Sequence, residues 1–172
     1  MSETISKERE KQILQAARII FGRFGFSKTT MEDISEEAEM GKASLYYYFP
    51  TKESLLEAVI KQEREEFMEK AEQILAQHKS QADKLKIYVE KRIKLFEGLM
   101  NLGMLSYYSF IQKKSVYQKQ SDEFGGWEMK VVQKIIEDGK ASGEFLADTD
   151  SETTARLLIH ILQGLRLRTV KK

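Results

Sequence analysis

The residues best suited to chemistry in this sequence lie close together at 41–49, Gly-Lys-Ala-Ser-Leu-Tyr-Tyr-Tyr-Phe. If this segment is a helix, successive side chains are about 100° apart, so Leu45 and Phe49 point the same way and Tyr48 lies nearby. The opposite wall carries small and hydroxyl-bearing side chains, namely Ala43, Ser44, Tyr46 and Tyr47. A small residue brings the backbone close to a groove, and hydroxyl groups hydrogen-bond to phosphates and bases. The segment therefore indicates binding to DNA.

Three further residues could contact the phosphate backbone of DNA. Lys42 begins the segment and Lys52 follows it, so the two ammonium groups bracket the helix. Thr30 lies at the predicted start of the preceding helix, where a hydroxyl and free backbone N–H groups suit a phosphate. Short helices joined in this way also occur in small three-helix units that do not bind DNA. Clustered aromatic residues, moreover, often belong to a core.

Catalysis finds little support in the sequence. There are no cysteines, which excludes thiolate metal sites and cysteine nucleophiles. The two histidines, His78 and His160, lie in different predicted helices, and no spacing of nucleophile and base or glycine-rich phosphate loop is present. We therefore predict no catalytic residues, no metal site and no cofactor.

Three predicted helices would position the 41–49 segment. The first begins at Ser6 and ends before Gly25, and its apolar face consists of Ile13, Ala17, Ile20, Phe21 and Phe24. Thr30 and Asp33 form a capping box at the start of the second helix. Gly41 can cap the third. These helices have the layout of a helix-turn-helix module.

The rest of the chain predicts five longer helices. Thr51 caps the fourth, which runs to about Gln77, and its segment 63–67 (EREEF) indicates a solvated helix face. The fifth covers roughly 84–100, with Leu85, Val89, Ile93 and Phe96 along one inward side. Residues 102–112 are apolar nearly all round, as in a buried helix.

Two more helices follow a polar stretch that is either a connection or a frayed helix start. The seventh contains Trp127 and ends near Gly143, a glycine in the position typical of a helix C-terminus. Thr149 and Glu152 form a capping box for the eighth. No alternating strand pattern is present, so the predicted fold class is all-α.

Charge and hydropathy bear on whether the protein binds DNA, associates with a membrane or is secreted. The net charge is +1, and the first 52 residues hold eight Lys or Arg and eight Asp or Glu, so bulk charge argues neither for nor against DNA. No apolar run approaches the roughly 20 residues needed to span a bilayer. The N-terminal sequence MSETISKEREK lacks the apolar stretch of a secretory signal. We expect no membrane association and a cytoplasmic location.

Residues 13–60 resemble the DNA-binding segment of the TetR family of transcriptional regulators. The resemblance includes Phe-x-x-x-Gly-Phe at the end of the first helix, Leu-Tyr-x-Tyr-Phe in the third and Lys52-Glu53 after it. It implies DNA contacts by Thr30, Lys42, Ala43, Ser44, Tyr46, Tyr47 and Lys52. Gly41 stands where the family more often has serine, which removes one candidate phosphate contact. The resemblance implies a helix-turn-helix DNA-binding domain at 1–51, and a fourth helix joining it to a helical effector-binding and dimerisation domain at 52–172.

In the second domain the resemblance implies an effector cavity and a dimer interface. Apolar and aromatic residues gather where the family places its cavity, namely Phe96, Met100, Met104, Tyr107, Tyr108, Ile111 and Trp127. A filled core is the alternative for each of them. We expect a small hydrophobic or amphipathic effector, a homodimer on a near-palindromic double-stranded DNA operator, and release from DNA on effector binding, the mode of a repressor. No further helix after the eighth is visible in the sequence. The alternative function is a DNA-binding protein with a nucleoid or cell-structure role that senses no ligand.

Overall fold

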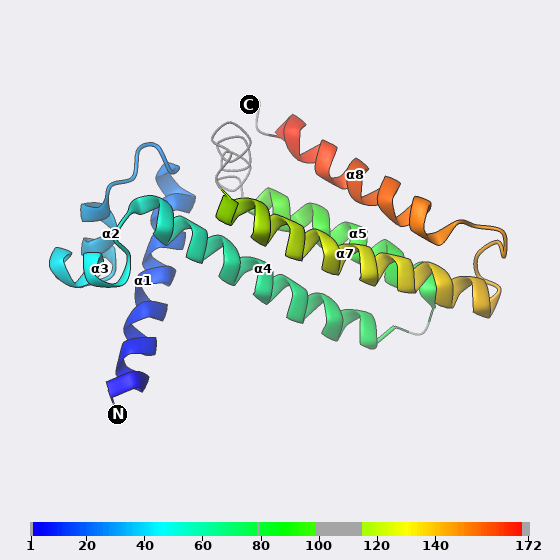
Figure 1. The fold of residues 1–172 in the computed structure, drawn as a ribbon, viewed down its shortest axis with the longest axis horizontal. Helices are drawn as coiled ribbons and strands as arrows, with labels where there is room; N and C mark the ends of the chain where they lie inside the picture. Colours follow the sequence, from blue (N-terminus) through cyan, green and yellow to red (C-terminus); the bar gives the residue numbers. More distant parts are fainter. Residues whose placement is uncertain (1, 79, 99–114, 170–172) are drawn as a thin grey trace. The chain divides into compact units, whose positions relative to one another are not determined.

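The computed structural model describes the backbone of residues 2–78, 80–98 and 115–169, and the side chains of 5–78, 80–94 and 122–164. Seven helices and no strand lie within these ranges (Figure 1). They are α1 (Ser2–Phe24), α2 (Met31–Glu37), α3 (Lys42–Tyr48), α4 (Lys52–Ala76), α5 (Gln81–Gly98), α7 (Ser115–Ser142) and α8 (Ser151–Thr169). The all-α prediction is confirmed, and the predicted helix at 102–112 lies outside the described residues. The chain forms two compact units, Met1–Glu63 and Arg64–Lys172, whose boundary falls within α4.

In the first unit, α2 packs against both α1 and α3 (Figure 1). The predicted stop of α1 is confirmed, because Gly25 follows it with a φ of 79°, a left-handed conformation that favours glycine. The start was predicted wrongly, since α1 begins at Ser2 and not at Ser6. Phe24 is also not a core residue: it is 48% exposed, and the Arg23 guanidinium lies 5.2 Å from its ring centroid. Phe26 packs on the core residue Phe21 in its place, with the ring centroids 5.7 Å apart.

The caps of the short helices agree with the sequence. The Thr30 hydroxyl accepts a hydrogen bond from the Asp33 N–H, and the Asp33 carboxylate accepts one from the Thr30 N–H, which confirms the capping box of α2. Gly41 is the N-cap of α3. Thr51 caps α4, because its hydroxyl accepts a hydrogen bond of 3.0 Å from the Ser54 N–H. Local signals therefore set the ends of these helices.

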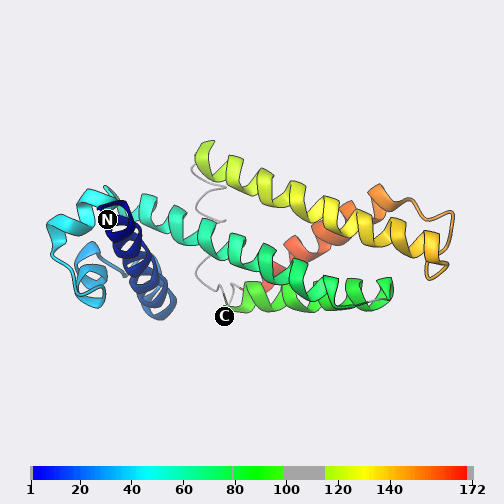
Figure 2. The same cartoon turned by 90° about the horizontal axis from the view of Figure 1, so that it is seen from below.

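In the second unit, α7 packs against α5 and α8, and α5 also packs against α8 (Figure 2). The core of this unit combines aromatic and aliphatic residues from four helices: Phe67, Ala71, Tyr88, Phe124, Val132, Ile136, Ala155 and Leu162. The inward side of α5 agrees with the prediction in part. Leu85 and Val89 pack against the core, as predicted. Ile93, however, is 36% exposed, and Tyr88 and Arg92 are buried. Tyr88 and Arg92 are four residues apart and so share one helix face, which the sequence analysis had not assigned to the core.

The ends of α7 and α8 decide two further details. α7 is helical from Ser115, so residues 115–126 of the polar stretch are the start of the helix, one of the two alternatives predicted for it. Gly143 ends it with a φ of 76°, as predicted. The predicted capping box of Thr149 and Glu152 is wrong. Asp150 lies one residue closer to the helix and accepts hydrogen bonds of 3.1 Å from the N–H groups of Glu152 and Thr153. Among the described residues, no helix is long and apolar enough to cross a membrane.

Candidate functional site

The third helix has one buried and one exposed wall, as the helical periodicity predicts. Leu45 is fully buried and Phe49 is 7% exposed, while Tyr48 is half-buried. On the other wall Tyr47 is 82% exposed and Tyr46 is 41% exposed. Ala43 is also exposed and Ser44 is half-buried on this wall. We call Ala43, Ser44, Tyr46 and Tyr47 the polar wall of α3.

The tyrosines of α3 are held in a defined arrangement. The ring of Tyr47 meets that of Tyr48 edge-on, with an interplanar angle of 86° and centroids 5.4 Å apart. Leu45 anchors the helix beneath them in the core. With Leu45 and Phe49 buried, Tyr47 stays exposed to solvent, where its hydroxyl can donate to an oxygen of another molecule.

Thr30 lies at the start of α2, but its polar groups are engaged. Its hydroxyl donates to the Asp33 carboxylate over 2.8 Å, and its N–H donates to the same oxygen over 2.7 Å. These hydrogen bonds lower the pKa of Asp33, because they stabilise the charged carboxylate. A phosphate at this helix start would have to share these donors with Asp33.

The two candidate lysines are also in contact with protein groups. Lys42 forms an exposed ion pair with Glu32. The half-buried Lys52 donates from Nζ to the carbonyl oxygens of Phe26 (2.8 Å) and Thr29 (2.7 Å), and Nζ lies 4.4 Å from the Phe26 ring centroid. Lys52 thus ties the start of α4 to the loop that leads into α2. Since an ammonium group has three N–H donors, one remains for a phosphate.

In the second unit, Trp127 is the one residue of the predicted effector cluster whose side chain is described. Phe96 lies in α5 but its side chain is outside the described set, as are Met100, Met104, Tyr107, Tyr108 and Ile111. The Trp127 indole N–H donates to Glu72 over 2.9 Å. Its ring lies 5.8 Å from that of Phe124, 6.0 Å from that of Phe67 and 6.5 Å from that of Tyr88. These four residues form what we call the aromatic cluster.

Charged residues lie beside the aromatic cluster, and they were not predicted from the sequence. Glu128 is 1% exposed and Arg92 is 3% exposed. The Glu128 carboxylate accepts hydrogen bonds from the Tyr88 hydroxyl (2.6 Å) and from Arg92 Nη2 (3.0 Å), and it also pairs with Arg92 Nε. Burial, and then the charge of Glu128, raises the pKa of Tyr88, so this hydroxyl remains a donor. The spacing of four residues in both Tyr88–Arg92 and Phe124–Glu128 is the signal that could have revealed this network.

The segment EREEF was predicted to be a solvated face, and two of its residues correct that prediction. Glu63 is 6% exposed and pairs with Arg18 Nε over 2.9 Å within the first unit. Arg64 is half-buried in the second unit, and its guanidinium carbon lies 5.4 Å from the Phe124 ring centroid. The charged end of Arg64 thus lies against an aromatic ring, a cation–π contact that a residue pattern alone does not show.

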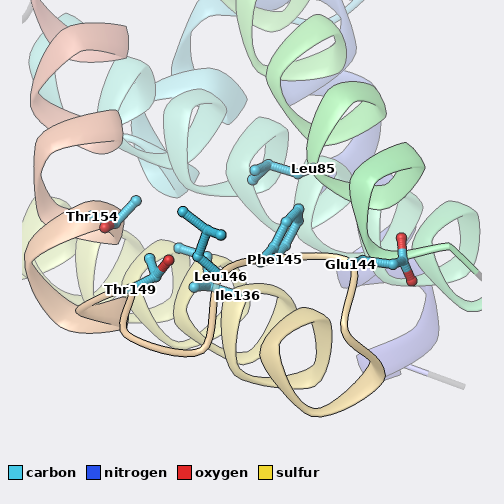
Figure 3. Close-up of a pocket in the computed structure, with 7 residues that line it drawn as sticks. All are labelled: Leu85, Ile136, Glu144, Phe145, Leu146, Thr149 and Thr154. Atoms are coloured by element: carbon cyan, nitrogen blue, oxygen red, sulfur yellow. The ribbon is translucent and has the colours of Figure 1, made fainter.

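A pocket of about 320 Å³ lies elsewhere in the second unit (Figure 3). It is lined by Leu85, Ile136, Glu144, Phe145, Leu146, Thr149 and Thr154. The Glu144 carboxylate points away from the other lining side chains. It accepts hydrogen bonds from the N–H groups of Gln81 (3.0 Å) and Ala82 (3.1 Å), and so caps the start of α5. Trp127, the predicted effector residue whose side chain is described, does not line this pocket. Leu146 is 76% exposed, so the pocket is an open groove. Within the described residues, no group of three His, Cys, Asp or Glu side chains is placed to bind a metal.

Comparison with known proteins finds a matching family model for each part of the chain. Residues 13–59 match the model of the family "Bacterial regulatory proteins, tetR family", and residues 60–165 match that of "YsiA-like protein, C-terminal region". The "Uncharacterized HTH-type transcriptional regulator YfiR" of Bacillus subtilis is 25% identical, over 96% of this chain and 83% of that protein. A transcriptional regulator from Cytophaga hutchinsonii has a similar crystal structure, with a TM-score of 0.82 and 38% identity over 94% of this chain and 81% of that one.

A third similar structure was solved with a ligand. The transcriptional regulator FadR of Bacillus subtilis, in complex with stearoyl-CoA, has a TM-score of 0.74 and 21% identity, covering 93% of this chain and 86% of that one. At 21% identity, the similarity to FadR shows that the two proteins share a fold.

Proposed function

This chain belongs to the TetR family of transcriptional regulators, and from that premise we propose that it is a ligand-responsive repressor that binds a near-palindromic operator as a homodimer. The observation that carries the proposal is the division of α3. Tyr47 is 82% exposed only two residues from Leu45, which is fully buried. An exposed wall of small and hydroxyl-bearing residues on a rigidly anchored helix fits the major groove of DNA.

The proposed DNA site consists of the polar wall of α3 with Thr30, Lys42 and Lys52. The tyrosine hydroxyls and the lysines would contact phosphates, while Ala43 lets the backbone approach base edges. Because Lys42 pairs with Glu32 in the free protein, it would exchange this carboxylate for a phosphate. One short helix makes few contacts, so two copies on one operator are needed for tight binding, and the affinity should fall steeply with salt.

An exposed apolar stripe on α8 supports the proposed homodimer. Leu157 is 58% exposed and Ile161 is 60% exposed, four residues further along the same helix face. Gly164 continues this side of the helix, and a Cβ atom placed on it would meet nothing within 4 Å. Apolar side chains beside a glycine suit close packing against the helix of a second copy, because the backbones can approach each other.

The second unit would bind an amphipathic effector. The aromatic cluster supplies apolar rings next to two polar groups, the Tyr88 hydroxyl and the Trp127 N–H, which are bound to Glu128 and Glu72 in the free protein. The stearoyl-CoA complex of FadR supports a long-chain acyl compound as the class of effector. α4 contributes Leu55 to the core of the first unit and Phe67 to that of the second. A shift of this helix on ligand binding would therefore alter the spacing of the two α3 helices and release DNA.

Selection of bound DNA from a random pool would define the operator and provide the assay for the site. Tyr47→Ala should weaken operator binding by about tenfold or more per site, the value of a hydrogen bond to a charged group. Phe24→Ala is the matched control, since Phe24 is an exposed aromatic residue of the same unit that lies outside the proposed interface. Both variants should retain the wild-type melting temperature. Unchanged operator affinity of Tyr47→Ala would show that the polar wall is not the DNA-binding surface.

The same operator complex tests ligand response and the mode of regulation. Long-chain acyl compounds should release the DNA in a mobility-shift titration, and a reporter placed behind the operator should be silenced by the wild-type protein. DNA binding that persists across a wide panel of apolar and amphipathic compounds would favour the nucleoid or cell-structure function.

A further inference from the structure

The described part of the aromatic cluster contains more positive than negative charge around one ring, that of Phe124. The guanidinium carbon of Arg92 lies 4.9 Å from the Phe124 ring centroid, and that of Arg64 lies 5.4 Å from it. Glu128 is the carboxylate that faces these cations, and it forms its bidentate contact with Arg92. Among the residues whose side chains the structure describes, two guanidinium groups and one carboxylate thus share the space around Phe124.

The other described carboxylate at the aromatic cluster, Glu72, is too distant to balance Arg64. It lies eight residues further along α4, about 12 Å at ~1.5 Å per residue, where it accepts the Trp127 N–H. Burial, followed by the charge of Arg92, lowers the pKa of the Arg64 guanidinium. An arginine nonetheless keeps its charge at neutral pH, so its proximity to Arg92 costs free energy unless an anion approaches.

Arg64 also has the exposure that a ligand contact requires. Arg92 is 3% exposed and is bound to Glu128, which also accepts a hydrogen bond from the Tyr88 hydroxyl. Arg64 is half-buried, so part of its side chain is reached by solvent, and its guanidinium carbon lies 5.4 Å from the Phe124 ring centroid. Its planar guanidinium can donate two parallel hydrogen bonds to a carboxylate or a phosphate.

We propose that the effector of this protein carries an anionic head group, a carboxylate or a phosphate, that binds Arg64 beside the Arg92–Glu128 pair while its apolar chain lies along the aromatic cluster. The inference rests on the proposed function and names the chemistry that the second unit selects. In this arrangement Arg64 contacts the ligand directly. Arg92 contributes a second positive charge, and Glu128 is the positioning residue that holds it.

The test compares probes that share a chain and differ in the head group: palmitate, palmitoyl-coenzyme A and the uncharged hexadecanol, each below its aggregation concentration. Trp127 is the only tryptophan and lies 5.8 Å from Phe124, so its fluorescence reports binding in the full-length protein. At least one anionic probe should bind about tenfold or more tightly than hexadecanol, as expected for a charge-assisted hydrogen bond. The probe with the greater preference identifies carboxylate or phosphate as the head group.

Arg64→Gln should abolish this preference, so that the anionic probes bind no more tightly than hexadecanol. Arg156→Gln is the matched control, because Arg156 is an exposed arginine of the same unit, on α8 and paired with Glu152, and it should keep the preference. If Arg64→Gln does not melt cooperatively, Arg64→Lys replaces it. This variant retains the charge without the fork of donors, and it should bind the anionic probe more weakly than wild type.

Equal affinities for anionic and uncharged probes, together with release of DNA, would overturn the inference and leave the proposed function in place. An anion preference that Arg64→Gln retains would also overturn it. Absence of binding by every probe would refute both the inference and the proposed class of effector, while operator binding would still be measured independently.

Discussion

Replacing Glu128 by glutamine tests whether a buried ion pair stabilises the second unit. Glu128 and Arg92 are 1% and 3% exposed, so both charges are removed from water. Glutamine keeps the shape of the side chain but removes the negative charge opposite Arg92. Breaking one side of a buried ion pair costs about 3–5 kcal/mol, because the remaining charge stays desolvated. With a urea dependence of about 1–3 kcal/mol per molar, the midpoint of unfolding should fall by at least about 1 M.

Fluorescence of Trp127 during urea denaturation provides the assay, since this residue lies beside the network in the same unit. The double variant Arg92→Met/Glu128→Met removes both charges and should recover most of the lost stability, as apolar replacements of buried pairs often do. Glu152→Gln, in the exposed pair with Arg156 on α8, is the surface control and should leave the midpoint nearly unchanged. A wild-type midpoint for Glu128→Gln would refute the buried-pair account. A double variant as unstable as Glu128→Gln would show that packing, not charge, determines the loss.

Two further predictions concern the first unit and the connection between α7 and α8. Leu45→Ala should lower the free energy of unfolding of the first unit by about 2–5 kcal/mol, because Leu45 is fully buried; a circular dichroism melt without loss would reverse the assignment of the α3 walls. Glu144 has a pKa lowered from 4.5 to about 2, first by the Gln81 N–H and then by the Ser80 hydroxyl. Since the folded pKa is the lower one, its stabilising effect is present above pH 4.5 and is lost as the pH falls towards 2. Glu144→Gln should therefore flatten the dependence of stability on pH in this window, and an unaltered pH profile would contradict the capping role.

Much of the first unit was predictable because its determinants are local. The capping box of Thr30 and Asp33, the stop at Gly25 and the two walls of α3 each depend on residues within about one or two helical turns. Helical periodicity then separates Leu45 from Tyr47 without knowledge of any other element. The DNA contacts assigned to this wall stay a prediction.

Where sequence reasoning failed, a distant element or a competing neighbour decided the outcome. Phe24 was placed in the core by periodicity, yet Phe26 fills that space because the chain turns after Gly25. Asp150 caps α8 in place of Thr149, because its carboxylate accepts hydrogen bonds from the N–H groups of both Glu152 and Thr153, and the prediction had paired Glu152 with Thr149.

The sequence by itself determined the all-helical architecture, the helix-turn-helix module and the face that α3 exposes, because these follow from helical spacing and from caps a few residues away. Only the tertiary structure decided that Arg64, Arg92 and Glu128 meet at Phe124, since they come from α4, α5 and α7. In the sequence, a charged residue that becomes buried looks the same as one that stays in solvent. The difference arises only when packing brings its partner within hydrogen-bonding distance. For the same reason, packing also showed that Lys52 is bound to the carbonyl oxygens of Phe26 and Thr29.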